Sequence, residues 1–285
     1  MISQAFEYTA PKTLDEALEL LAEGAKPLSG GMSLIPMMKL RLAAPDHLVD
    51  LGRLKDLNYI REEGGSLHIG ATTTHQEVAG SALVRAKCPL LAQTAAGVGD
   101  PQVRNRGTIG GSAAHADPSA DYPAALEALE ATFVLKGAKS ERTVAAADFF
   151  LDTFMTALEP GEIVREVIVP IEDSGTGTYY EKVVQKASGF AVVGIAIRIK
   201  KASGKISWAR VGVTGLSNHA YRATAVERAL EGGAEVQHAA AMVAQGVDAN
   251  SDLHASAEYR THLAVVHTAR ALMAAMSRCE QPRTS

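Results

Sequence analysis

The first helix that the hydrophobic pattern predicts begins after Thr13. Apolar residues recur at helical spacing from residue 14 to residue 21, which gives this stretch one apolar face. Thr13 can cap the helix, and Glu16, three residues later, can complete a capping box. Gly24 is placed to end it. A short strand–helix unit containing the glycine turn 28–31 follows.

The remaining pattern predicts an alternation of strands and helices, then a run of strands, then a run of helices. Strands are expected at 47–51, 66–70, 132–136, 162–169, 180–184, 191–199 and 206–213. Helices are expected at 74–78, 89–97, 120–129, 223–231, 236–246 and 257–277. The segment 99–112 is dense in Gly, Pro, Asn and Asp, so it is expected to be a loop. The polar stretch 172–177 indicates a domain boundary near residue 175.

Composition narrows the class of protein. The 285 residues are 47% hydrophobic and 21% charged, and the net charge is -4. These values are typical of a globular protein of two or three domains. No basic stripe runs along the chain, which argues against nucleic-acid binding. No apolar stretch reaches the roughly 18 residues that cross a bilayer, so the chain is not expected to be integral to a membrane.

The N-terminus and the cysteines indicate a reducing compartment. The first 13 residues lack a basic segment followed by an apolar one, so no secretory signal is expected. Cys88 and Cys279 stand far apart without a CxxC pattern, which argues against an iron–sulfur cluster or a structural zinc site in this chain. Two buried structural thiols in a cytoplasmic protein are the simplest interpretation.

Two glycine turns are candidates for anion binding. The first is Ser29-Gly30-Gly31-Met32-Ser33, and the second is Thr108-Ile109-Gly110-Gly111-Ser112. Paired glycines allow positive φ and close backbone approach, and successive N–H groups in such a turn can hold a pyrophosphate. Either could be a plain tight turn, but two on one chain could hold one dinucleotide from two lobes. GxGxxG and GxxxxGK[ST] are both absent, which argues against a Rossmann domain or a P-loop.

These turns carry a resemblance to a known family. The chain resembles the medium, flavoprotein subunit of the carbon monoxide dehydrogenase and xanthine dehydrogenase group of molybdenum hydroxylases. The segments that carry it are SGGMSLIPMMKLRL (29–42), GDPQVRNRGTIGGSAAHADPSADYPAAL (99–126), EKVVQKASGFAVVGIA (181–196), VGVTGLSNHAYRA (211–223) and SAEYRTHLA (256–264). Together they span nearly the whole chain.

The resemblance implies an α+β fold. An FAD-binding domain of the vanillyl-alcohol oxidase (PCMH) type would occupy residues 1–175, in two lobes of about 1–55 and 56–175. A C-terminal domain, residues 176–285, would hold a three-stranded antiparallel sheet with a helix bundle.

The resemblance also implies which residues contact the cofactor. Those expected at FAD are Leu28, Ser29, Gly30, Gly31, Met32, Ser33, Leu34, Thr108, Gly110, Gly111, Ser112, His115, Asp121, Val164 and Lys186. Gln185 and Lys182 remain alternatives to Lys186 for the polar contact to the flavin. On this assignment a Gly110→Val chain is expected to keep its fold and lose FAD.

Simpler alternatives stay open for several of these residues. His115 could be a loop histidine with ordinary partners, and Asp117 and Asp121 could be helix N-terminal charges. Lys182 and Lys186 could be solvated. Two positions depart from many relatives: Met32 stands where they have His or Gln, and Phe190 where they often have Tyr. Arg104 and Arg106 could face the cofactor or a partner subunit.

The family's function follows as an expectation. A large subunit would hold the molybdenum cofactor, and a small subunit would carry two [2Fe–2S] clusters. Electrons would pass from a cluster to FAD on this chain, and then to an external acceptor such as a quinone, NAD or oxygen. No residue of this chain is expected to be catalytic or to bind a metal. The complex would be cytoplasmic, with contact to the inner face of the membrane left open. A stand-alone FAD oxidoreductase and a flavin-free assembly protein are the alternatives.

Overall fold

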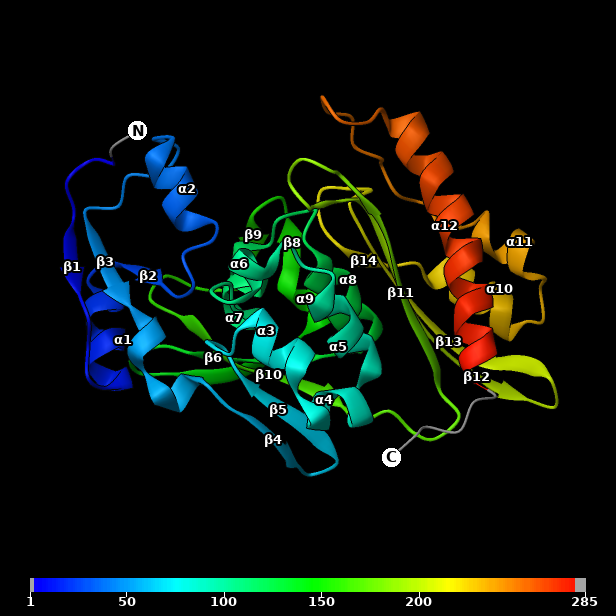
Figure 1. The fold of residues 1–285 in the computed structure, drawn as a ribbon, viewed down its shortest axis with the longest axis horizontal. Coiled ribbons are helices and arrows are strands. Elements are labelled where there is room, and N and C mark those ends of the chain that lie inside the picture. Colours follow the sequence, from blue (N-terminus) through cyan, green and yellow to red (C-terminus); the bar gives the residue numbers. More distant parts are fainter. Residues whose placement is uncertain (1–2, 280–285) are drawn as a thin grey trace.

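The first lobe is a small parallel sheet with helices packed on it. Residues 3–279 are described in the computed structural model (Figure 1). The lobe contains β1 (Glu7–Thr9), α1 (Leu14–Ala22), β2 (Lys26–Leu28), α2 (Leu34–Lys39) and β3 (His47–Asp50), and its strand order is β1-β3-β2. Both strand pairs are parallel. Two single turns of 3-10 helix, Leu51–Arg53 and Lys55–Leu57, lead to the second lobe.

The helix α1 begins as the pattern predicts, with one change in its cap. The side chain of Thr13 accepts a hydrogen bond from the Glu16 backbone N–H at 3.2 Å. The carboxylate of Glu16 accepts from the backbone N–H of Lys12 at 2.8 Å, not from that of Thr13. The reciprocal half of the expected capping box is therefore made one residue earlier.

The second lobe is an antiparallel five-stranded sheet of order β4-β5-β10-β6-β7. Its strands are β4 (Ile60–Glu63), β5 (Ser66–Gly70), β6 (Thr132–Lys136), β7 (Glu141–Ala145) and β10 (Ile163–Pro170). Its helices are α3 (His75–Gly80), α4 (Ala82–Lys87), α5 (Pro89–Ala96), α6 (Pro101–Arg104), α7 (Ile109–His115), α8 (Asp121–Ala128) and α9 (Ala146–Phe149). A small hairpin, β8 (Phe150–Asp152) and β9 (Met155–Thr156), follows α9.

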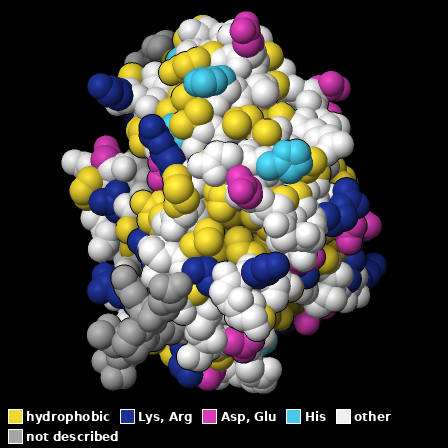
Figure 2. Space-filling view, turned by 90° about the vertical axis from the view of Figure 1, so that its right-hand side faces the viewer, with side chains coloured by type: hydrophobic (Ala, Val, Ile, Leu, Met, Phe, Trp, Pro, Cys, Tyr) yellow, Lys and Arg dark blue, Asp and Glu magenta, His cyan; other side chains and the backbone are white. Residues whose placement is uncertain are grey.

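The C-terminal part is an antiparallel sheet of order β11-β12-β13-β14 with helices on its outer face (Figure 1). Its elements are β11 (Gly177–Val184), β12 (Ala191–Ala202), β13 (Lys205–Thr214), β14 (Tyr221–Arg222), α10 (Thr224–Glu231), α11 (Val236–Ala240) and α12 (Ala257–Arg278). The three long strands are those the pattern predicts, and the two-residue β14 is added at the edge. Positive and negative side chains are interspersed on the outer face of this part (Figure 2).

The helix α8 lies between the two sheets and is buried along its whole length. All eight of its residues are buried. It packs on β12 and β13, on the face opposite α12 and α10. Small residues allow this close approach, since a methyl group at Gly212 of β13 would overlap the backbone carbonyl of Ala124. One continuous apolar cluster therefore includes residues of the second lobe together with Tyr180 and Ala196 of the C-terminal sheet.

Three expectations about the chain need correction. The segment 99–112 is not a plain loop, because Asp100 caps α6 and Thr108 caps α7 within it. The helix expected at 236–246 ends at Ala240. Cys88 is buried as expected, but Cys279 is only partly buried, and its thiol lies 3.7 Å from the Ile199 carbonyl oxygen. Within residues 3–279, no helix is long and apolar enough to cross a membrane.

Candidate functional site

A cavity of about 1010 Å³ lies where the first lobe meets the second. Its volume is at the upper end of the range for ligand pockets in proteins. Its walls include both glycine turns and 14 of the 15 residues expected at FAD, all except Lys186. The chain therefore brings together, from positions 28 to 164, the residues that the sequence had separated.

The first turn joins β2 to α2, and its glycines serve two different purposes. Gly31 has φ of +75°, a conformation that favours glycine. Gly30 has an ordinary backbone conformation, but a methyl group there would overlap the carbonyl oxygen of Arg106. Gly30 is therefore required for close contact between the lobes. Ser33 precedes α2 and makes no side-chain cap hydrogen bond, so its hydroxyl is available at the cavity wall.

The second turn is the first turn of α7. The Thr108 hydroxyl accepts a hydrogen bond from the Gly111 backbone N–H at 3.1 Å and thus caps the helix. The same hydroxyl lies 2.9 Å from the hydroxyl of Ser29 in the first turn. The two turns, 79 residues apart in sequence, are therefore joined by a direct hydrogen bond at the cavity wall.

The glycine pair of this turn also has two roles. A methyl group at Gly110 would overlap Ala71, at the end of β5, whereas one at Gly111 would lie 2.7 Å from the Thr108 hydroxyl. Gly110 is buried against protein and Gly111 is only half-buried. The expectation that Gly110→Val would spare the fold is therefore wrong, because the valine would push into the second lobe's own backbone.

His115 and Val164 line the cavity from opposite sides of the second lobe. His115 is the last residue of α7, and its ring packs on Phe154 at 5.0 Å between centroids. Burial lowers the pKa of His115, which favours the neutral ring. Val164 is buried in β10. Met32 and Phe190, the two departures from many relatives, line the cavity with exposed side chains, 39% and 41% accessible.

Asp121 is the first residue of α8 and is buried, although it is a carboxylate. Its Oδ1 accepts a hydrogen bond from the Tyr180 hydroxyl at 2.6 Å, and its Oδ2 accepts from Lys182 Nζ at 2.8 Å. Burial raises the pKa of Asp121, and Lys182 and Tyr180 oppose that shift. Lys182 is not a solvated charge, since its side chain is only 8% exposed. Asp117 lies in the loop before α8 and accepts from the Ser119 backbone N–H.

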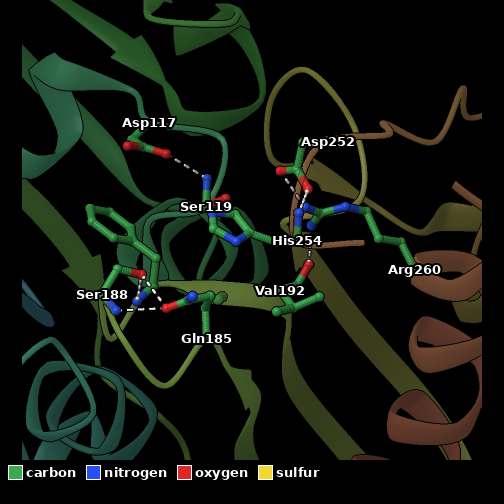
Figure 3. A pocket seen from close by; sticks show the side chains of 10 residues that line it. Asp117, Ser119, Gln185, Ser188, Val192, Asp252, His254 and Arg260 are labelled. Carbon is green, nitrogen blue, oxygen red and sulfur yellow. Dashed lines mark hydrogen bonds and ion pairs between the residues drawn. The ribbon is translucent and has the colours of Figure 1, made fainter. Parts of the chain in front are cut away.

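The segment after β11 settles where Lys186 and Gln185 lie. Lys186 is exposed and outside the cavity wall. The Gln185 side-chain oxygen accepts from the Ser188 backbone N–H and hydroxyl at 2.6 and 3.0 Å, which shapes the turn that carries Phe190 (Figure 3). Gln185, Ser188 and Phe190 line a second, smaller pocket of about 270 Å³, which Ser188, Phe190 and Asp117 share with the large cavity.

Arg104 and Arg106 are also placed by the structure. The Arg104 guanidinium donates to the carbonyl oxygens of Val98 and Gly99 at 2.9 and 3.2 Å, so it holds the turn before α6. Arg106 has an exposed side chain, and it is its backbone that meets Gly30. Neither guanidinium lines the cavity.

Two polar residues at the inner end of the cavity were not expected from the sequence. Thr72 Oγ1 and His75 Nδ1 line it and are buried without a hydrogen-bond partner in the chain. Burial lowers the pKa of His75 to about 4, so the ring is neutral near pH 7. Only the capping box at Thr74, which the pattern predicts and the structure confirms, gave any signal in this segment.

These features fit a bound dinucleotide. Gly31 and Gly111 give close backbone approach, Ser33 offers a hydroxyl, and Thr72 and His75 offer polar atoms that lack partners. The remaining lining is largely aliphatic, as a ring system requires. No group of three or more metal-ligating side chains occurs among the described residues 3–279.

Comparison with known proteins gives the same answer along the whole chain. The family described as FAD binding domain in molybdopterin dehydrogenase matches residues 4–172, and the CO dehydrogenase flavoprotein C-terminal domain matches residues 178–275. The carbon monoxide dehydrogenase medium chain of Hydrogenophaga pseudoflava is 44% identical over 286 residues, covering 98% of this chain and 100% of that one.

Two further relatives give the range of the likeness. A solved structure of carbon monoxide dehydrogenase from Hydrogenophaga pseudoflava superposes with a TM-score of 0.95 at 46% identity, covering 98% of this chain and 100% of that one. The glyceraldehyde dehydrogenase medium chain of Sulfolobus acidocaldarius is 37% identical over 277 residues, 95% of this chain and 98% of that one.

Proposed function

Because this chain belongs to the family of FAD-binding subunits of molybdopterin dehydrogenases, we propose that it is the electron-transfer subunit of a heterotrimeric molybdenum hydroxylase. A large subunit would hold the molybdenum cofactor, and a small subunit would carry the [2Fe–2S] clusters. Electrons would come to the flavin from a cluster and leave to an external acceptor, a quinone, NAD or oxygen. We place this complex in the cytoplasm.

The junction of the two glycine turns carries this proposal. Ser29 and Thr108 meet at 2.9 Å on the wall of one cavity large enough for a dinucleotide. Bound FAD supplies the redox chemistry. The backbone N–H groups of the two turns would hold its pyrophosphate, with Ser33 and Ser112 adding hydroxyl donors. Phe154 and Phe190, at the cavity edge, would limit the access of water.

The rest of the wall orients the cofactor and does no proton chemistry. His75 and His115 are both kept neutral by burial, which lowers the pKa of each ring. Both oxygens of Asp121 already accept hydrogen bonds from within the chain. No side chain among these combines an available basic atom with a charged partner that would activate it. This argues against a stand-alone oxidoreductase, which needs a base beside the flavin.

The first test is the absorbance spectrum of the purified chain, with the released cofactor identified by mass. A flavin band from released FAD is expected. A colourless protein that also fails to take up added FAD would overturn the proposal and favour an assembly protein. Purines, aldehydes and N-heterocycles added without partner subunits should leave the flavin band unchanged. Bleaching by any of them would favour the stand-alone enzyme.

A further inference from the structure

Behind the cavity wall lies a buried ion pair that joins the C-terminal sheet to the FAD-binding part. Asp121 lines the cavity, but its partner Lys182, on β11, does not. The Lys182 ammonium donates to Asp121 Oδ2 at 2.8 Å and to the carbonyl oxygen of Gly97 at 3.0 Å. Three elements, α5, α8 and β11, therefore converge on one lysine whose side chain is 8% exposed.

A second donor fixes the other carboxylate oxygen. The Tyr180 hydroxyl donates to Asp121 Oδ1 at 2.6 Å, and it lies where a methyl group at Gly194 would come within 2.5 Å of it. Gly194 on β12 thus leaves room for this hydroxyl. The groups that face Asp121 are Tyr180 and Lys182 from β11 and, beside it on α8, Tyr122. Lys182 is the only cation among them.

This arrangement has a consequence for the cavity wall. A carboxyl group at this depth would keep its proton near neutral pH without a cation beside it, since burial favours the uncharged form. Each carboxylate oxygen can accept more than one hydrogen bond, so each can still accept from a ligand. With Lys182 in place, the wall offers a hydrogen-bond acceptor, and the pair carries no net charge.

We infer that Lys182 is a positioning residue for the flavin, holding Asp121 ionised and oriented at the cavity wall, with Tyr180 as the second support. The inference rests on the proposed function. Removing the cation leaves a carboxyl that titrates beside the cofactor. Its negative charge, when present, disfavours adding electrons to the ring, because the site is shielded from solvent.

The experiment uses the full-length, FAD-loaded chain with Lys182→Met, and Lys182→Arg as the conservative variant. Lys186→Met is the matched control, because this lysine is four residues away, exposed and outside the cavity. The flavin spectrum and its two-electron midpoint potential are measured from pH 5.5 to 9. Lys182→Met is expected to add one ionisation, at about pH 6–8, to both. The wild type, Lys182→Arg and Lys186→Met should lack it.

Two further variants secure the assignment. In Lys182→Met with Asp121→Asn the added ionisation should vanish, which attributes it to the carboxyl. If Lys182→Met does not fold, Tyr180→Phe removes one support and keeps the ring, and it should still shift the pH dependence. A pH dependence identical to wild type in every folded variant overturns the inference but leaves FAD binding intact. A wild-type chain that takes up no FAD overturns both.

Discussion

The hydrogen bond between Ser29 and Thr108 allows a quantitative test of how the two lobes build one site. Thr108→Val keeps the shape of a buried side chain, 5% exposed, and removes its hydroxyl. Two interactions are lost: the cap on the Gly111 N–H at 3.1 Å and the bond to Ser29 at 2.9 Å. Loss of the cap costs about 0.5–2 kcal/mol, and loss of the second bond costs about 0.5–1.5 kcal/mol. We expect the apoprotein to lose about 1–3 kcal/mol of unfolding free energy.

Binding of FAD should weaken more than this loss of stability explains. A hydrogen bond to a charged group contributes about 1.5–3 kcal/mol, which corresponds to roughly a 10- to 100-fold rise in the dissociation constant. Titration of apoprotein with FAD, followed by quenching of flavin fluorescence, measures it. Ser256→Ala is the matched control, because Ser256 caps α12 through the Tyr259 N–H at 3.2 Å, away from the cavity.

A double-mutant cycle then isolates the contact between the turns. Ser29→Ala, Thr108→Val and their combination should show a coupling free energy of about 0.5–1.5 kcal/mol in the apoprotein. The reasoning is refuted if Thr108→Val binds FAD within about twofold of wild type. Strict additivity of the two substitutions would show that the contact does not join the lobes in solution.

Three other predictions follow from burial. Gly110→Ala should lower the melting temperature of the apoprotein as well as of the FAD-bound protein, because its methyl group meets Ala71; a loss confined to FAD binding would contradict this. Gly212→Ala should cost about 1–3 kcal/mol, measured by urea denaturation, since it overlaps the Ala124 carbonyl, and an unchanged midpoint would show that α8 can shift. The pKa of His75 is lowered to about 4, so the unfolded chain binds the extra proton first. Stability should therefore fall by about 3 kcal/mol as the pH drops from 6.5 to 4, and His75→Gln should flatten that part of the pH profile.

Long, regular elements could be predicted from the pattern, and short ones could not. Strands β6 and β12 alternate or run apolar over enough residues to be recognised, and α12 begins at the residue predicted. The strands β1 and β2 have three residues each, too few for any periodicity. The segment 99–112 misled for a different reason: its glycines and polar residues are caps and packing contacts of short helices.

The candidate site could be predicted where it is built from local motifs. Both glycine turns are local, and the structure brings them to one cavity. The pairing of Asp121 with Lys182 spans 61 residues and depends on how β11 docks beside α8, which no local pattern encodes. His75 was missed because its burial comes from Gly107 and Tyr122, which pack around it only in the folded chain.

The complete burial of α8 also bears on how the chain is made. The helix and the sheet that covers it are separated by more than 80 residues of sequence, because β13 ends only at Thr214. A ribosome needs on the order of ten seconds to synthesise that interval. Throughout it, the small apolar face around Ala124 has no partner from this chain. The nascent FAD-binding part is therefore the stage at which a chaperone or premature aggregation would compete with folding, and cofactor loading has to wait for the last third of the protein.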